Sequence, residues 1–247
     1  MSVYARVAIQ NHLLAALPDR DFARLRGSLK QVSLGLGEVI YESGEQIEHI
    51  YFPIDSVISL LYTTEEGATA EMGLAGNDGF VGLALLLGGN TTPNRAVAQI
   101  AGECWRIRAG IVRDEFTRGG ALQALVMHYI HAFITQVSQT AVCNRLHSVE
   151  KRLCRWLLLC HDRTFSNDLW MTQEFIANML GGRRESVTVA AGRLQDLGWI
   201  RYARGRITIL DRNGLEGAVC ECYRTVKNEA DRLVSLRERS IKAALKN

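Results

Sequence analysis

Two arginines and a glutamate stand side by side in the C-terminal half of the chain, at Arg183, Arg184 and Glu185. They follow two glycines and open a run of residues with helical periodicity. Arginine can pair bidentately with guanine, and glutamate can accept a hydrogen bond from cytosine. Two arginines at a helix start oppose the helix dipole, which an anionic partner would offset. The trio therefore predicts base reading in DNA, although solvated charges on an ordinary helical hairpin would give the same residues.

A helix-turn-helix from Met171 to Gly198 would position this trio. Thr172 is placed to cap the first helix. Gly181 and Gly182 would end that helix, because glycine adopts positive φ at no steric cost. Apolar residues recur at helical spacing on the second helix: Val187, Ala190, Ala191, Leu194 and Leu197.

Two short alternating segments follow, 199–202 and 206–210, with a turn at 203–205. They predict a basic hairpin, so that the whole has the winged form of the motif. A recognition helix presents its N-terminal residues to base edges, and wing arginines can hold phosphates. We expect DNA to be contacted by the following residues: Thr172, Arg183, Arg184, Glu185, Thr188, Val189, Arg193, Arg201, Arg204 and Arg206.

The charge of the chain is unevenly distributed. Residues 1–150 contain 11 Lys/Arg and 15 Asp/Glu, a balance of −4, whereas residues 151–247 contain 18 and 11, a balance of +7. A basic half that holds the helix-turn-helix is the footprint expected of a domain that meets phosphate. No apolar run approaches the ~20 residues needed to cross a bilayer, and no secretory pattern opens the chain. We expect a cytoplasmic protein without membrane partners.

The region from about 30 to 108 has a different pattern, with short alternating segments separated by glycines. Many short strands with regular turns predict an antiparallel roll or barrel. A helix is expected before it at 11–27, and another at 80–87 within it.

A long helical run is predicted from about Ile111 to Val149. It carries two apolar stripes, one of which includes Leu122, Val126 and Tyr129 and can pack on the roll. The other is spaced as in a coiled coil and would pack on a second copy of the chain; its members are Met127, Ile130, Ile134, Val137 and Ala141. A core helix in a monomer is the alternative. Further helices are expected at 151–160 and 215–239.

The six cysteines, Cys104, Cys143, Cys154, Cys160, Cys220 and Cys222, contain no CxxC pair. Cys220 and Cys222 give a weak hint of metal binding, but two helical residues at i and i+2 do not face each other. We therefore expect small core residues and no metal site.

The order of parts resembles the cyclic-AMP receptor protein / fumarate-nitrate regulator (Crp/Fnr) family of bacterial transcription regulators. The most specific match runs from Leu180 to Val187, where an Arg-Glu pair followed by Ser and Val opens the recognition helix. The resemblance implies an α+β fold: an N-terminal antiparallel β-roll like a cyclic-nucleotide-binding domain, a long dimerisation helix and a C-terminal winged helix-turn-helix. We place these at residues 1–112, 113–149 and 150–214, with a helical extension at 215–247.

By this resemblance, Arg184 would read a guanine and Glu185 a cytosine. Val189 occupies the position of a third base-reading arginine, so that the half-site differs from the family's usual one. Valine can instead contact the methyl group of thymine.

The sensor departs from the family's nucleotide cassette. The resemblance implies ligand contacts at Gly79, Phe80, Val81, Gly82, Arg95 and Ala96. Phe80 stands in place of the family's ribose-binding glutamate, and Arg95 comes one position before the family's phosphate-binding arginine. A shift of one residue on a strand turns a side chain to the other face. The N-terminal cysteines of the iron–sulfur branch are also absent. We expect no bound cofactor and no response to cyclic AMP, with another small-molecule effector or none.

These features predict a dimeric, sequence-specific, DNA-binding transcription regulator and not an enzyme. Its expected partners are double-stranded DNA and a second copy, with RNA polymerase as a further candidate. Two alternatives remain. A metal-dependent enzyme on the roll would need clustered ligands, yet residues 30–108 contain one histidine, His49. A ligand-binding module could use its helix-turn-helix for protein contacts only, and DNA binding with steep salt dependence would exclude it.

Overall fold

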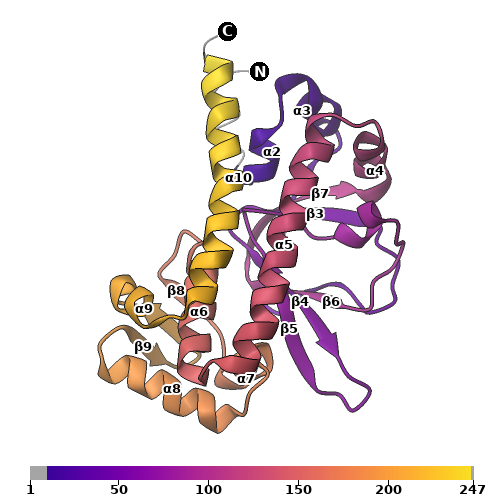
Figure 1. Cartoon of the computed structure of the whole chain (residues 1–247). Coiled ribbons are helices and arrows are strands. Elements are labelled where there is room, and N and C mark those ends of the chain that lie inside the picture. The colour runs from indigo at the N-terminus through magenta and orange to yellow at the C-terminus, as the bar shows by residue number, and fades with distance from the viewer. Residues whose placement is uncertain (1–9, 246–247) are drawn as a thin grey trace.

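The computed structural model describes residues 10–245. Residues 1–9 and 246–247, which belong to the first and last predicted segments, lie outside it. A β-roll, a long helix and a helical domain with a small sheet follow one another (Figure 1). The predicted α+β order of roll, long helix and winged helix-turn-helix is therefore confirmed. The elements of the N-terminal half are α2 (His12–Ala16), α3 (Asp19–Arg26), β1 (Lys30–Leu34), β2 (Val39–Tyr41), β3 (His49–Pro53), β4 (Val57–Thr63), β5 (Thr69–Ala75), η1 (Leu83–Leu87), β6 (Arg95–Ile100) and β7 (Gly102–Arg108).

Two antiparallel sheets make the roll. One has four strands in the order β2-β6-β4-β5 and the other has three in the order β1-β7-β3. Val57–Leu61 of β4 is buried throughout, so that its sequence reads as an apolar run. Between the sheets, a cluster of small and apolar side chains that includes Ile58, Val81 and Ala98 fills the interior.

The N-terminal segment forms two short helices instead of the single helix expected at 11–27. Leu17 is extended, with ψ 139°, and Pro18 is the N-cap of α3. Proline disfavours the helical conformation in the residue before it, which breaks the helix at this point.

The long helical run is also divided, into α4 (Ala109–Thr117) and α5 (Ala121–Leu146). Gly119 and Gly120 separate them with φ of 81° and 91°, a left-handed backbone that ends α4. On α5, Leu122, Val126 and Tyr129 are buried against the roll, as the second stripe predicted. The predicted single element from Ile111 was wrong because this glycine pair interrupts it.

The C-terminal domain starts with α6 (Val149–His161), and its core is continuous with that of the roll. Val57, Leu61 and Leu74 of the roll pack in the same cluster as Trp156, which is 1% exposed. Past the end of α6, the guanidinium of Arg163 lies 2.6 Å from the carboxylate of Asp78, and both side chains are buried. The two domains are thus joined by apolar packing and by a buried ion pair.

The remaining elements are β8 (Asp168–Trp170), α7 (Gln173–Leu180), α8 (Arg184–Asp196), β9 (Ile200–Ala203), β10 (Arg206–Ile209), α9 (Arg212–Ala218) and α10 (Glu221–Leu245). The wing is a three-stranded sheet in the order β8-β10-β9. Strand β8 was not predicted, because three residues are too few to show a period.

The C-terminal extension holds two helices instead of the one expected at 215–239. Val219 is extended, with ψ 153°, so that α9 ends before Cys220 and α10 begins at Glu221. Helix α10 then runs back beside α5 and reaches α2 (Figure 1). No helix in residues 10–245 has the length and apolar character to cross a membrane.

Candidate nucleic-acid interface

The turn between α7 and α8 has the local chemistry that the sequence predicted. The backbone N–H of Phe175 donates to Oγ1 of Thr172 at 3.1 Å, which caps α7. Gly181 ends α7 in the left-handed region with φ 56°. Arg183, expected in the first turn of α8, is instead its N-cap, and Val187 is fully buried against α6 and α7. These contacts fix the direction in which α8 leaves the domain.

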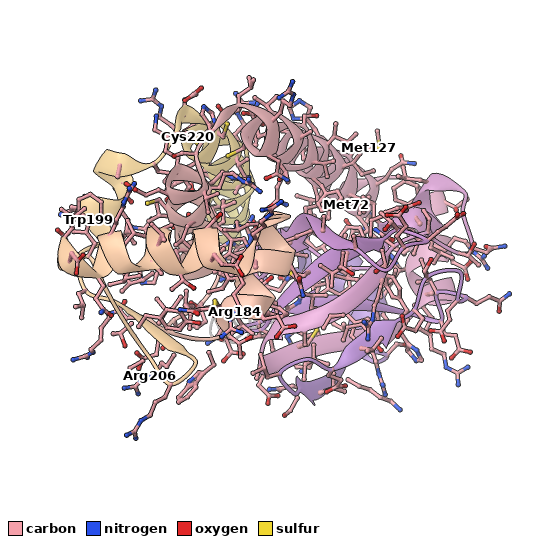
Figure 2. All side chains as sticks on the ribbon, turned by 90° about the horizontal axis from the view of Figure 1, so that it is seen from below. Met72, Met127, Arg184, Trp199, Arg206 and Cys220 are labelled. Carbon is pink, nitrogen blue, oxygen red and sulfur yellow. The ribbon has the colours of Figure 1, made fainter. Side chains whose placement is uncertain are left out.

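The first turns of α8 present their side chains to solvent. Arg183, Arg184, Glu185 and Thr188 are exposed, and the side chain of Val189 is 57% exposed. Among the side chains that the structure describes, neither of the two arginines nor Glu185 takes part in an ion pair within 4 Å. Charges without intramolecular partners are free to meet the phosphates and base edges of a nucleic acid. In Figure 2, α8 crosses the near side of the molecule with Arg184 at the end next to the roll.

The wing lies beside α8 and adds further cations. Arg204 and Gly205 form its turn with φ of 51° and 74°, the left-handed pair typical of a tight hairpin. Arg201 and Arg204 are exposed on it. Arg206 is more engaged: its guanidinium lies 5.5 Å from the centre of the Trp170 ring and 3.9 Å from Asp168. Figure 2 shows Arg206 on the same side of the molecule as Arg184.

A groove of about 450 Å³ separates the wing from the start of α8. Thr172 and Arg184 line one side, and Tyr202 and Arg204 line the other. The Tyr202 hydroxyl donates to the carbonyl oxygen of Met171 at 3.1 Å, which holds this wall to the domain. Burial raises the pKa of Tyr202, so that its hydroxyl stays neutral beside the arginines. Arg184 and Arg204 therefore bring positive charge to the groove, whose lining also includes Glu174.

Arg193, expected among the DNA contacts, points toward another part of the domain. Its guanidinium lies 3.3 Å from the carboxylate of Glu150 on α6. Both side chains are partly solvent-exposed, so that this pair adds little stability. Arg193 is therefore less available to DNA than Arg183 or Arg184.

Four of the residues expected to bind a ligand in the sensor, those at 79–82, lie in the packed interior. Phe80 is 2% exposed, and its ring centre is 4.9 Å from that of Tyr129. The Tyr129 hydroxyl donates to the carbonyl oxygen of Phe80 at 2.9 Å, and the aromatic ring lies against Gly79. Backbone hydrogen bonds join Val81 to Tyr51 in both directions. The contacts of Gly79 and Phe80 with Tyr129 hold α5 to the roll.

Arg95 and Ala96 occupy opposite faces of β6. Ala96 is fully buried in the roll interior. The side chain of Arg95 is 40% exposed, and its Nε lies 3.1 Å from a carboxylate oxygen of Glu42. The side chain of Arg95 thus lies on the outer face of β6, as the one-residue shift in the sequence predicted. A separate cavity of about 800 Å³ opens at the end of the roll, with Gln46, His49, Arg108 and Arg113 among its lining residues.

Two known domain families match this chain, one in the N-terminal half and one in the C-terminal half. The cyclic nucleotide-binding domain matches residues 31–118, and the Crp-like helix-turn-helix domain matches residues 151–218. The chain belongs to the Crp/Fnr family. Crp/Fnr proteins are transcription regulators and not enzymes, which agrees with the prediction from the sequence.

Solved structures of Crp/Fnr regulators share the fold. FixK2 from Bradyrhizobium japonicum is 15% identical, and the match covers 78% of this chain and 98% of that one, with a TM-score of 0.66. A CRP-family regulator from Thermus thermophilus is 19% identical over 76% and 95%, with a TM-score of 0.63. The c-di-GMP responsive regulator CLP from Xanthomonas campestris is 14% identical over 77% and 98%, with a TM-score of 0.60. The search of curated proteins found no match.

In this Crp/Fnr chain, the predicted dimer stripe on α5 is largely open. Met127 and Ile134 are 54% and 58% exposed, Val137 is half-buried and Ala141 is exposed. Ile130 is the exception, because it is 7% exposed and packs within its own chain. The expectation that Ile130 faces a second copy was therefore wrong.

One group of residues in this Crp/Fnr chain was missed by sequence reasoning. We call it the Cys₃His cluster, and it consists of Cys143, His147, Cys220 and Cys222. Cys143 lies 77 residues before Cys220, so that no short spacing motif connects them. The rule against facing residues at i and i+2 does not apply either, because Cys220 precedes α10 and is not helical.

Proposed function

We propose that the protein is a homodimeric regulator that reads a two-fold symmetric DNA site with α8, and whose sensor does not respond to cyclic AMP. The observation that carries DNA reading is the exposed start of α8, where Arg184 and Glu185 have no ion-pair partner among the described residues. The wing arginines on the same side supply contacts to phosphate. Specificity would come from the first pair and general affinity from the wing.

The stripe on α5 supports a dimer. Met127, Ile134 and Ala141 recur at intervals of seven residues on a solvent-exposed face, as in a coiled-coil seam. Helix α10 packs near Gln136 and Cys143, which lie on the other side of α5 by helical geometry, and it reaches the edge of the stripe where a carboxylate oxygen of Glu229 lies 3.3 Å from Nδ1 of His131. Met127, Ile134 and Ala141 stay exposed beside this contact, so that a second copy could join this face.

The interior of the roll supports the lack of a response to cyclic AMP. No Asp or Glu occurs between Gly79 and Arg95, so that no carboxylate in this segment can accept from ribose hydroxyls. Arg95 is paired with Glu42 on the outside of β6, away from the interior that a nucleotide would need. Entry of a nucleotide would also require Phe80 to leave its packing against Tyr129.

Selection of bound DNA from random sequence tests the proposal directly. We expect an inverted repeat with half-site centres about one helical turn apart. A single unrepeated motif, or no enrichment at all, would contradict it. Saturating cyclic AMP should leave the affinity for the selected site unchanged, and a clear increase would refute the assignment of the sensor.

The dimer has a separate test in sedimentation equilibrium. Ile134→Asp places a charge in the apolar stripe and should give a monomer, because an unpaired charge is costly in an apolar contact. Val142→Asp, on an exposed position of the same helix outside the stripe, is the matched control. A wild-type chain that is monomeric at the concentrations used for DNA binding would overturn this part of the proposal.

A further inference from the structure

The Cys₃His cluster lies where α5 ends and α10 begins. The Sγ atoms of Cys143 and Cys220 are 3.6 Å apart, and Sγ of Cys222 is 3.6 Å from Nδ1 of His147. All four candidate ligand atoms lie within 4.8 Å of one another. The three cysteines are buried, and the His147 side chain is 14% exposed. Two distant parts of the chain thus bring three sulfurs and one imidazole to one point.

These separations fit a tetrahedral zinc site. With Zn–S of about 2.3 Å and Zn–N of about 2.0 Å, two sulfurs lie about 3.8 Å apart and a sulfur lies about 3.5 Å from a nitrogen. The two separations of 3.6 Å agree with these values. A disulfide would instead bring the two sulfurs to about 2.05 Å. Three cysteines and one histidine are also a common ligand set of structural zinc.

The surroundings of His147 fit a metal ligand as well. With Nδ1 facing the sulfurs, its other nitrogen, Nε2, lies 3.5 Å from a carboxylate oxygen of Glu221. A histidine bound to a metal usually directs its second nitrogen to a carboxylate or a carbonyl, which orients the ring and strengthens it as a ligand. Glu221 belongs to the same turn of chain as Cys220 and Cys222, so that one segment supplies two ligands and this support.

Two buried arginines adjoin the cluster and have no carboxylate partner within 4 Å among the described residues. Arg152 and Arg155 are 7% and 4% exposed, and the charge of each acts on Cys143. The Nε atoms of both lack a hydrogen-bond partner in the described part of the chain. A Zn²⁺ ion with three thiolates and a neutral imidazole carries a net charge of about −1. Such a site would place negative charge beside these two buried guanidiniums.

We propose that the Cys₃His cluster binds one Zn²⁺ ion and fastens the start of α10 to the end of α5. His147 is the C-cap of α5, and Ser148 next to it caps α6 of the DNA-binding domain. From the cluster, α10 runs back along α5 to α2. The ion would therefore anchor α10, which connects the sensor and the DNA-binding domain, at the point where the two domains meet. This proposal does not depend on the proposed DNA site or on the dimer.

The first test measures zinc in the full-length wild-type protein after purification from zinc-supplemented cells. We expect one Zn²⁺ per chain by elemental analysis. Replacement by Co²⁺ should give the strong visible absorption of a tetrahedral site with a thiolate-to-cobalt charge-transfer band. Both readouts use the unaltered chain, so that neither depends on a variant that folds.

Variants then assign the ligands. Cys143→Ala and Cys222→Ala should lose the charge-transfer band and the stoichiometric metal, and Glu221→Gln should weaken zinc affinity about 10–100-fold. Cys104→Ala is the matched control, since it is a buried cysteine in the roll and should retain one ion per chain. The unfolding temperature of the wild type should fall on chelation, because the ion binds only the folded chain.

Three results would overturn the assignment. One is a wild-type chain that neither retains Zn²⁺ nor develops a thiolate–cobalt band. Another is a metal that stays bound in Cys143→Ala with unchanged affinity. The third is a disulfide between Cys143 and Cys220 in the native protein under reducing conditions, which would explain their proximity without an ion.

Discussion

The basic half of the chain contains two kinds of arginine, in two regions that differ in solvent exposure. At the start of α8 and on the wing, Arg184 and Arg204 are exposed and have no ion-pair partner among the described side chains. Around α6, Arg155 and Arg163 are buried, and Arg163 is held by Asp78. The +7 balance of residues 151–247 therefore overstates the charge available to DNA. Net charge identified the domain that carries the helix-turn-helix. Which of its arginines can contact phosphate depends on the partners of each arginine within the folded chain.

The two regions follow from the cost of removing charge from water. A buried guanidinium needs a nearby anion, because the desolvation penalty amounts to several kcal/mol. An exposed guanidinium incurs almost none of this penalty, so that it can remain unpaired until a nucleic acid arrives. The buried Arg163 therefore joins the two domains through Asp78, while the exposed arginines are left for binding.

The largest expected effect is on the buried pair. Asp78→Ala leaves Arg163 charged and uncompensated at the junction of the domains, and should lower the free energy of unfolding by about 3–5 kcal/mol. Asp231→Ala is the control, because its partner Lys227 is exposed and that pair contributes roughly 0–1 kcal/mol. Urea unfolding measures both. Equal losses in the two variants would show that burial does not distinguish the two regions.

The next effect is on binding and not on stability. Arg184→Ala should weaken binding to the selected DNA site by about 1–3 kcal/mol and relax the preference at one base pair. Its unfolding midpoint should stay close to that of the wild type, since the side chain supports no packing. Arg26→Ala, on the exposed face of α3, is the control. Mobility shifts on a set of single-base variants give the measurement, and a loss equal on every sequence would mean that Arg184 holds only phosphate.

These contrasts also explain how far the sequence could predict the molecule. The cap at Thr172, the turn at Gly181 and the apolar face of α8 were predictable because they depend on neighbours within a few residues. The wing strand β8 was missed because it is too short to show a period. The burial of Ile130 depends on how α5 meets the roll, which no local pattern records.

The Cys₃His cluster was missed for a similar reason. Cys143 and Cys220 lie far apart in sequence, and the two residues at the break before α10, Val219 and Cys220, are neither glycine nor proline. Features that depend on neighbouring residues could therefore be predicted from the sequence. Contacts that form because α10 returns along α5 could not.

A buried carboxyl at the junction gives a smaller effect, which depends on pH. Glu71 on β5 is 7% exposed, and burial raises its pKa. Because the folded chain prefers the neutral acid, this contribution to stability is fully present below the unfolded-state pKa and is lost as pH rises through the raised value.

Glu71→Gln removes this ionisation, so that its stability relative to the wild type should increase as the pH rises from about 4.3, the ordinary pKa of glutamate, into the neutral range. Glu65→Gln, exposed in the turn after β4, is the control and should show no such trend. Urea unfolding across this range measures it. A constant difference at every pH would mean that Glu71 does not titrate in the folded chain over this interval.

The smallest expected effect separates the wing from α8. Arg204 has φ 51°, a left-handed conformation that asparagine tolerates well, so that Arg204→Asn removes the charge without straining the turn. We expect a loss of affinity that is equal on all DNA sequences. The slope of log affinity against log salt concentration should fall by about 0.9, the value for one lost phosphate contact. Arg204→Lys keeps the charge and should restore the slope. If Arg204→Asn instead changed the preference at one base pair, the wing would take part in reading bases, and the division between a base-reading helix and a phosphate-holding wing would have to be abandoned.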